Sequence, residues 1–148
     1  MTSSVYKLLY CSRNAIEGSS DQHAAEIRKI LASARTNNAA LGITGALLFN
    51  GACFAQVLEG PLDAVEKLFE KIQQDPRHGD VTLLESGYVD HRDFPEWSMA
   101  FAGSGAEEAA AFAEFNFYEA LARPSAAATE VQDLLRSLVV QEEDWAAA

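Results

Sequence analysis

The 148-residue sequence contains only 2 cysteines, and no Cys or His spacing in it is typical of a zinc or iron–sulfur site. Basic residues are also few: 11 Lys and Arg stand against 22 Asp and Glu, giving a net charge of −11. A protein this acidic is repelled by a phosphate backbone. No apolar run approaches the roughly 18 residues of a membrane span, and the first residues lack the apolar centre of a signal peptide. We therefore expect a cytoplasmic protein that binds no metal, no nucleic acid directly and no membrane, with Cys11 and Cys53 as buried thiols.

Motifs of the common catalytic sites are absent too. The sequence has no G-x-S-x-G, no G-x-G-x-x-G or Walker-type glycine loop, and no carboxylate pair placed for acid–base work. His23 and His91 lack the spacing of a nucleophile partner or a metal ligand and are interpreted as surface residues. These absences favour a binding protein over an enzyme.

The first half of the chain alternates between strand and helix patterns. Residues 5–12 are apolar enough for a central strand, and Ser19 and Gln22 form a capping box that begins a helix. We expect this helix to end at Asn37–Asn38, because asparagine tolerates a left-handed C-terminal turn. Residues 42–49 and 52–60 flank Asn50–Gly51, which predicts two antiparallel strands joined by a two-residue turn.

The pattern then continues with a helix and two strands. Pro61 suits a first helical position, and this second helix must end before Pro76. Residues 81–89 and 97–103 are interpreted as the fourth and fifth strands. The order β-α-β-β-α-β-β predicts an α+β, ferredoxin-like sheet with both helices on one face.

The other face of the sheet needs a cover, for which we expect the end of the chain. Capping boxes at Ser104–Glu107 and Thr129–Gln132 predict two further helices. We expect residues 1–103 to form the core and residues 104–148 a C-terminal helical extension packed on the same domain.

Two polar residues do not suit their predicted core positions. A two-residue turn would pair Gly45 with Gln56, leaving a glutamine among apolar side chains with room beside it. Tyr10 lies on the same face of the adjoining strand, where its hydroxyl needs a partner. Either both are satisfied inside the core, or they form a hydrogen-bonded pair aimed at a ligand.

Other polar residues also leave two interpretations open. Asn38 is by default a helix C-cap, but its amide suits a ligand edge that alternates C=O and N–H groups, as a flavin ring does. Lys67, Lys71, Arg77 and His78 either complement a helix C-terminus or bind the phosphate of a ligand. Trp97 and Met99 alternate on the fifth strand and are most simply core.

Four segments in succession, LLYCSRN, TNNAALGITGALLFNGACFAQVLEG, IQQDPRHGDV and FPEWSMAF, resemble the BLUF domain, a flavin-binding sensor of blue light. The resemblance covers residues 5–103, and the two helices after it are similar to those of short, single-domain members. It implies that FAD, or FMN as the alternative, lies between the first two helices. It also implies a homo-oligomer or a downstream signalling protein as partner.

The resemblance assigns roles to individual residues. It implies that Tyr10 is the electron donor and that Gln56 is the amide between the tyrosine and the flavin. Trp97 and Met99 match the pair on the fifth strand that completes the photochemical set. The remaining positions that match flavin contacts are Ile30, Asn37, Asn38, Phe54, Lys71, Ile72, Asp75, Arg77 and His78.

The implied mechanism is a photocycle without turnover. Blue light would drive electron and proton transfer from Tyr10 via Gln56, and a changed hydrogen bond would shift the absorption reversibly to the red. The signal would pass through the fifth strand and the C-terminal helices. Two alternatives are a small ferredoxin-like hydrolase of the acylphosphatase type, which the missing phosphate loop disfavours, and a flavin-binding module without photoactivity.

Overall fold

One five-stranded sheet, in the order β4-β1-β3-β2-β5, organises the computed structural model, which describes residues 5–49, 51–95, 100–102 and 117–147. The strands are β1 (Val5–Asn14), β2 (Thr44–Phe49), β3 (Cys53–Gly60), β4 (His78–Val89) and β5 (Ala100–Ala102). β1 pairs antiparallel with β3 and β4, and β3 with β2, whereas β5 runs parallel to β2. The predicted ferredoxin-like α+β fold is therefore confirmed.

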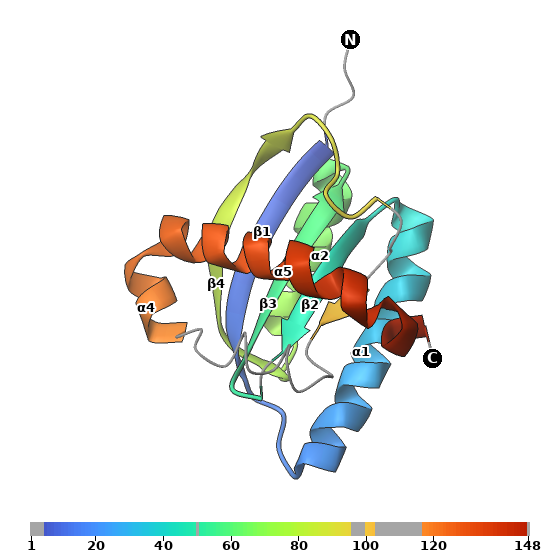
Figure 1. Ribbon diagram of the computed structural model, residues 1–148, viewed down its shortest axis with the longest axis vertical. Helices are drawn as coiled ribbons and strands as arrows, with labels where there is room; N and C mark the ends of the chain where they lie inside the picture. Colours follow the sequence, from blue (N-terminus) through green and yellow to red (C-terminus); the bar gives the residue numbers. More distant parts are fainter. Residues whose placement is uncertain (1–4, 50, 96–99, 103–116, 148) are drawn as a thin grey trace.

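Helices cover both faces of this sheet. α1 (Ser20–Leu41) and α2 (Leu62–Gln74) lie on one face, and α5 (Pro124–Ala147) crosses the other, preceded by α4 (Phe117–Ala122) (Figure 1). Side chains alternate across each strand, so the sheet has two buried clusters. Leu8 and Tyr10 of β1 pack with the α1–α2 side, whereas Leu9 packs with Val131 and Leu135 of α5.

α1 begins as predicted and ends later than predicted. Ser19 and Gln22 make both hydrogen bonds of a capping box. The C-cap is Gly42, with φ 73°, so Asn38 is a helical residue and the expected end at Asn37–Asn38 is wrong. Glycine reaches this left-handed conformation without the steric cost that asparagine retains, and the helix continues to it.

The β2–β3 hairpin has a longer loop than the predicted two-residue turn. Phe49 pairs with Phe54 and Leu47 with Gln56, which shifts the expected register by two residues. The end of β1 holds the loop, because Asn14 donates from its backbone to the carbonyl of Ala52 and from its side chain to that of Gly51. A shift of two residues keeps every side chain on its predicted face.

Two further boundaries differ from the sequence expectations. β4 begins at His78 instead of residue 81, because β1 is long enough to pair with it there. α5 begins at Pro124, so Thr129 lies inside the helix, where its hydroxyl donates to the carbonyl of Ser125, and does not cap it. The predicted Ser104–Glu107 capping box, Trp97 and Met99 lie outside the described residues.

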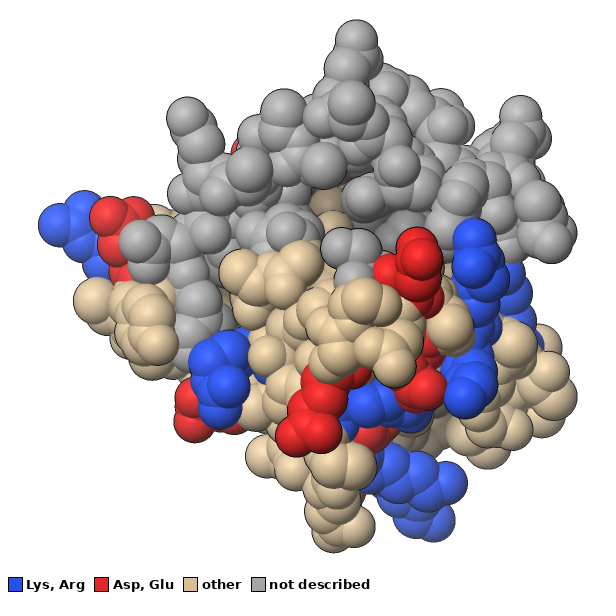
Figure 2. Space-filling model, turned by 90° about the horizontal axis from the view of Figure 1, so that it is seen from below, with Lys and Arg blue, Asp and Glu red and all other residues tan. Residues whose placement is uncertain are grey.

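Three properties of the core and surface complete the fold. Cys11 and Cys53 are buried and unbridged, as expected. Among the described residues, none of the helices has the length and apolar character needed to cross a bilayer. The described part of the face seen from below carries acidic and basic side chains next to one another (Figure 2).

Candidate functional site

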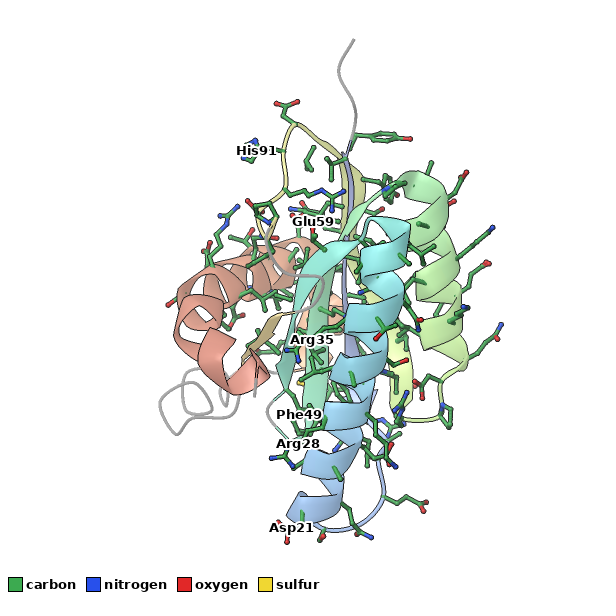
Figure 3. All side chains as sticks on the ribbon, turned by 90° about the vertical axis from the view of Figure 1, so that its right-hand side faces the viewer. Asp21, Arg28, Arg35, Phe49, Glu59 and His91 are labelled. Carbon is green, nitrogen blue, oxygen red and sulfur yellow. The ribbon has the colours of Figure 1, made fainter. Side chains whose placement is uncertain are left out.

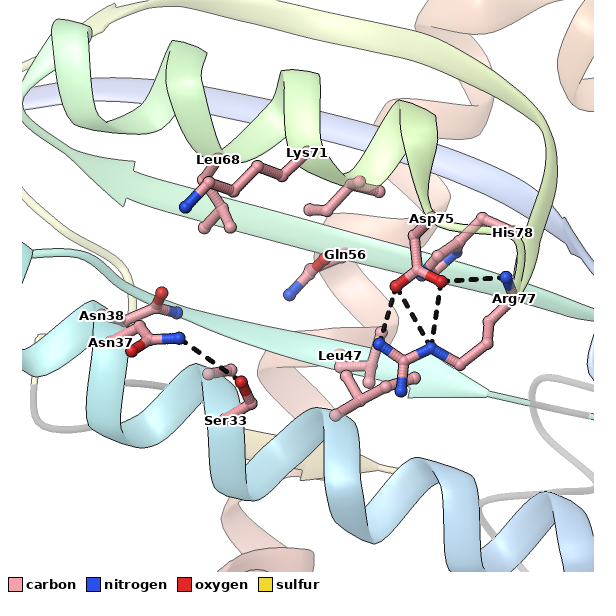
Figure 4. A pocket seen from close by; sticks show the side chains of 13 residues that line it. Ser33, Asn37, Asn38, Leu47, Gln56, Leu68, Lys71, Asp75, Arg77 and His78 are labelled. Atoms are coloured by element: carbon pink, nitrogen blue, oxygen red, sulfur yellow. Dashed lines mark hydrogen bonds and ion pairs between the residues drawn. The ribbon is translucent and has the colours of Figure 1, made fainter.

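A cavity of about 230 Å³ lies between α1 and α2, over the middle of the sheet (Figure 4). Its walls combine apolar side chains with amides, and its charged residues come from the C-terminal end of α2 and the turn after it. Mostly apolar walls with a few convergent polar groups are typical of a small-molecule site. The lining residues are Ile30, Ser33, Ala34, Asn37, Asn38, Leu47, Gln56, Leu68, Lys71, Ile72, Asp75, Arg77 and His78.

Tyr10 and Gln56 form the polar centre of this site. They are paired across β1 and β3, and the Tyr10 hydroxyl donates a hydrogen bond to Gln56 Oε1. Tyr10 is fully buried beneath the cavity, whereas Gln56 lines it. Burial raises the pKa of Tyr10, so the phenol keeps its proton. The predicted hydrogen-bonded pair is therefore present.

The expected room beside Gln56 has a different origin from the one predicted. Gly45 is opposite Leu58, and Leu47 is opposite Gln56. A Cβ atom on Gly45 would lie 2.0 Å from the Val57 carbonyl oxygen, so this glycine allows close approach of two backbones. The space in front of Gln56 comes from the separation of α1 and α2.

Asn37 and Asn38 lie side by side in α1 but in different surroundings. Asn38 is fully buried and lines the cavity, while Asn37 is exposed and donates from Nδ2 to the Ser33 hydroxyl at 3.3 Å (Figure 4). Asn38 is not the C-cap of α1, so capping of the helix does not explain why its side chain is buried. Its amide supplies donor and acceptor groups at the cavity wall.

Charged residues close one end of the cavity. Arg77 donates to the Asp75 carboxylate from Nη2 at 2.7 Å and from Nε at 3.0 and 3.1 Å, and its Nη1 lies 3.4 Å from Glu26 Oε1 in α1. Although burial acts in the opposite direction, these hydrogen bonds lower the pKa of Asp75. Arg77 thus joins the end of α2 to α1.

His78 occupies the floor of the same end. Its Nδ1 lies 2.7 Å from the Ser12 hydroxyl oxygen. The centre of its ring is 4.5 Å from the centre of the Phe54 ring and 6.1 Å from the centre of the Tyr10 ring. Burial lowers the pKa of His78 to about 4, so the imidazole is neutral at physiological pH. Phe54 is fully buried behind it instead of lining the cavity.

A second cavity of about 420 Å³ adjoins the first and opens toward the end of α1. The two share Asn37, Asn38, Leu68 and Lys71, and the second adds Lys67. Lys67 and Lys71 are one helical turn apart on α2 and both line this space, whereas Arg77 is paired with carboxylates at the other end. The four predicted cationic positions therefore do not form one cluster.

The sequence analysis missed four apolar or small wall residues: Ser33, Ala34, Leu47 and Leu68. Helical spacing from Ile30 and Asn37 identifies Ser33 and Ala34, and spacing from Lys71 and Ile72 identifies Leu68. Leu47 depends on the register opposite Gln56, which the hairpin loop changes. Its two-residue alternation with Phe49 still gives the correct face.

The chain is similar to several known proteins over part or most of its length. Residues 5–100 match the BLUF family, described as sensors of blue-light using FAD. A photoactivated adenylate cyclase subunit beta from Euglena longa is 42% identical over 78 residues, which are 52% of this chain and 9% of that protein. The blue light- and temperature-regulated antirepressor BluF of Escherichia coli strain K12 is 37% identical over 79 residues, 53% of this chain and 20% of BluF. The chain thus matches a small part of these longer relatives.

A solved structure covers nearly all of the chain. The structure described as the photo-activated state of BlsA aligns with a TM-score of 0.74 and 29% identity, over 94% of this chain and 97% of BlsA. The similarity therefore extends beyond the region that the family match covers, into the C-terminal helices.

Proposed function

Because this chain belongs to the BLUF family of flavin-binding sensors of blue light, we propose that light acts on the hydrogen bond between Tyr10 and Gln56. The observation that carries the proposal is the Tyr10 hydroxyl donating to Gln56 Oε1, with the Gln56 side chain directed into the cavity (Figure 4). Tyr10 and Gln56 are buried, but the Gln56 side chain borders the cavity, so a ligand bound there can change the hydrogen bonds of the pair.

The donor set of the cavity fits a flavin. When bound, flavin supplies a ring that absorbs blue light and then accepts an electron. The amides of Asn38 and Gln56 suit an edge of alternating C=O and N–H groups, and Ile30 and Ile72 supply apolar walls. The polar parts of the flavin would be held by Lys71, Asp75, Arg77 and His78. Asn37 would support the site from outside and Phe54 from behind. The proposed cofactor is FAD, with FMN as the alternative.

The hydrogen bond of Tyr10 to Gln56 would let this tyrosine lose an electron and a proton together. Its phenol is protonated in the dark, and the proton already points at Gln56 Oε1. An oxidised phenol is a far stronger acid, so once Tyr10 has given an electron to bound flavin, its proton would move to Gln56 Oε1 while Gln56 Nε2 gives up a proton toward the cavity. Return of both to Tyr10 then leaves the Gln56 side chain in a changed orientation with different hydrogen bonds. Trp97 and Met99 would complete this photochemical set.

The output of the sensor would leave through β5 and the C-terminal helices. β5 pairs with β2 next to Leu47, which is opposite Gln56, and α5 packs on the face of the sheet away from the cavity. We propose that residues 1–103 form the flavin-binding core and that residues 104–148 are an extension on the same domain. The signal would then reach a partner protein or a second copy of the chain. On this proposal the chain is a sensor and not an enzyme.

Absorption spectra of the purified protein test the photochemistry. We expect a flavin spectrum that shifts to the red immediately after blue light and returns in the dark. Tyr10→Phe should retain flavin and lose the shift, because the donor hydroxyl is gone. Tyr88→Phe makes the same change at a tyrosine that is 61% exposed and should behave like the unmodified protein.

Other spectra would contradict the proposal at different points. A normal red shift in Tyr10→Phe would overturn the donor role of Tyr10. Bound flavin that never shifts would indicate a flavin-binding module without photoactivity, and failure to take up added flavin would contradict flavin binding itself.

Hydrogen exchange in the dark and under blue light tests the output. We expect the exchange rates of amides in residues 117–147 to differ between the two conditions. Equal rates in a protein that does shift to the red would exclude the C-terminal helices as the route.

A further inference from the structure

A buried carboxylate lies on the face of β3 opposite the cavity. Glu59 is fully buried and follows Gln56 by three residues, an odd separation that places the two side chains on opposite faces of the strand. Its carboxylate accepts the backbone N–H groups of Asp93 at 2.7 Å and Phe94 at 3.0 Å. Burial raises the pKa of Glu59, although these two hydrogen bonds act in the opposite direction. Glu59 therefore fixes the segment 90–95, which follows β4, to β3.

The segment 90–95 makes two further attachments to the sheet and its core. Arg92 Nη1 donates to the Thr44 hydroxyl at 2.9 Å and to the Glu59 backbone carbonyl at 3.1 Å. The Phe94 side chain is buried in the same cluster as Leu135 of α5. Figure 3 shows Glu59 at the end of the sheet nearest the loop that carries His91. The segment is therefore attached to the start of β2 and the end of β3 as well as to the core.

Asp93 also connects this segment to α5. Its Oδ2 accepts hydrogen bonds from Gln132 Nε2 at 2.6 Å and Arg136 Nη2 at 3.0 Å. Gln132 is buried, and its other amide atom, Oε1, accepts from Lys7 Nζ of β1 at 3.4 Å. The Asp93 side chain is 19% exposed, so solvent screens these bonds only in part.

We propose that Asp93 is the positioning residue that couples β3 to α5, and that it thereby carries a light-induced change at Gln56 to the C-terminal helix. Its backbone N–H is bound to Glu59 of β3, and its carboxylate is bound to Gln132 and Arg136 of α5. One residue thus holds both elements. A displacement of Glu59 must move α5 or break one of these hydrogen bonds.

This inference rests on the proposed photoreceptor function and specifies its output. β5 and the apolar cluster also touch α5, so the sheet has other contacts with that helix. The role of Asp93 is therefore distinguished by removing its carboxylate and asking whether α5 still responds to light. The apolar packing of Val131 and Leu135 stays in place in that variant.

Asp93→Ala in the full flavin-loaded chain is the main test. The backbone N–H that binds Glu59 remains, and only the bonds to α5 are removed. We expect the red shift and its recovery to match those of the unmodified protein. The light-minus-dark difference in hydrogen exchange over residues 131–137 should fall by about threefold or more, the size of effect that residues within a coupling network produce.

Two further variants complete the design. Gln132→Met removes the closest partner of the Asp93 carboxylate on the α5 side while keeping the length of the side chain, and it should reproduce the loss even if Asp93→Ala folds poorly. Asp90→Ala removes an exposed carboxylate from the same segment and should leave the light-dependent difference unchanged. Far-UV circular dichroism establishes that each variant is folded.

The outcomes separate the coupling from the photochemistry. If Asp93→Ala and Gln132→Met shift to the red and keep the full exchange difference in α5, Asp93 is not the coupling residue. Loss of the red shift in both variants would place these residues in the photochemistry and also overturn the inference. An unmodified protein that never shifts to the red would contradict the proposed function itself.

Discussion

The hydrogen bond between Tyr10 and Gln56 fixes the position of the phenol proton and the orientation of the Gln56 amide. A buried phenol keeps its proton because the charged phenolate would lose the stabilisation of water, and this proton assigns Gln56 Oε1 as its acceptor. The Gln56 amide nitrogen then points to the cavity side (Figure 4). At the scale of single residues, the pair therefore has one defined arrangement, from which the proposed light-induced change would start.

His78 gives the protein an acid sensitivity that can be measured. Burial lowers its pKa to about 4, against about 6.5 in an unfolded chain. Between these values the unfolded state binds a proton that the folded state does not, so the free energy of unfolding falls as the pH falls. We expect His78 to contribute a loss of roughly 2–3 kcal/mol between pH 7 and pH 4.5.

Urea denaturation of His78→Gln at these two pH values checks this prediction. The variant keeps a hydrogen-bonding side chain near Ser12 but has no titrating group, so it should lose less stability on acidification than the unmodified protein. His91→Gln, at an exposed position, is the control. Equal acid sensitivity in His78→Gln and the unmodified protein would show that His78 is not buried in its neutral form.

Gly45 is required by the approach of two strands. An added Cβ would lie 2.0 Å from the Val57 carbonyl oxygen, which is part of the backbone and cannot turn aside. We expect Gly45→Ala to lower the free energy of unfolding by more than about 2 kcal/mol. Gly87→Ala, in β4 where a Cβ meets nothing within 4 Å, should change it by less than about 1 kcal/mol. Similar values for both would contradict the close approach.

At the scale of elements, two of the predicted helix caps provide a matched pair. Ser19 makes a capping box at the start of α1, whereas Thr129 lies within α5. Ser19→Ala should therefore cost about 1 kcal/mol. Thr129→Ala should be neutral or slightly stabilising, because alanine has the higher helix propensity and the Thr hydroxyl only bonds back to Ser125.

Thermal or urea denaturation of both variants measures the difference. A loss of about 1 kcal/mol in Thr129→Ala would indicate that α5 begins near residue 129 after all. Stability unchanged in Ser19→Ala would show that the capping box contributes nothing to α1.

The errors of the sequence analysis fall at element ends. Ser19–Gln22 depends on neighbouring residues only, and it was predicted correctly. The end of α1, the hairpin loop and the start of β4 depend on partners far along the chain, such as Asn14 for the loop. Single-sequence patterns carry no information on such partners, so these boundaries were displaced although the elements themselves were found.

At the scale of the whole molecule, one sheet supports the cavity on one face and α5 on the other. Leu135 of α5 is fully buried in the cluster that includes Leu9 and Val57. Leu135→Ala should lower the free energy of unfolding by about 2–4 kcal/mol. Because the sheet is shared, it should do so in a single transition that also includes the α1–α2 side.

Hydrogen exchange and circular dichroism along a urea titration check this cooperativity. Exchange in β1 and in α5 should shift to lower urea together in Leu135→Ala, and Ser137→Ala, at an exposed position of the same helix, should shift neither. Faster exchange confined to α5 would show that this helix unfolds separately from the sheet.

The paired residues of the site were predictable because each depends on local alternation. Tyr10 and Gln56 were placed on one face by a period of two, and the family motifs assigned the remaining positions. The connection from Glu59 through Asp93 to Gln132 joins residues more than 30 positions apart in each step. Nothing in the local pattern of any of the three indicates the other two.

The odd separation of Gln56 and Glu59 along β3 has a consequence for protein engineering. A strand reverses the face of every following side chain when one residue is inserted or deleted. One added residue between these two would turn Glu59 toward the cavity and leave Asp93 without its anchor, even with every side chain retained. Insertions in pairs would keep the parity, so a designer who fuses, lengthens or permutes this domain near β3 must count residues by twos.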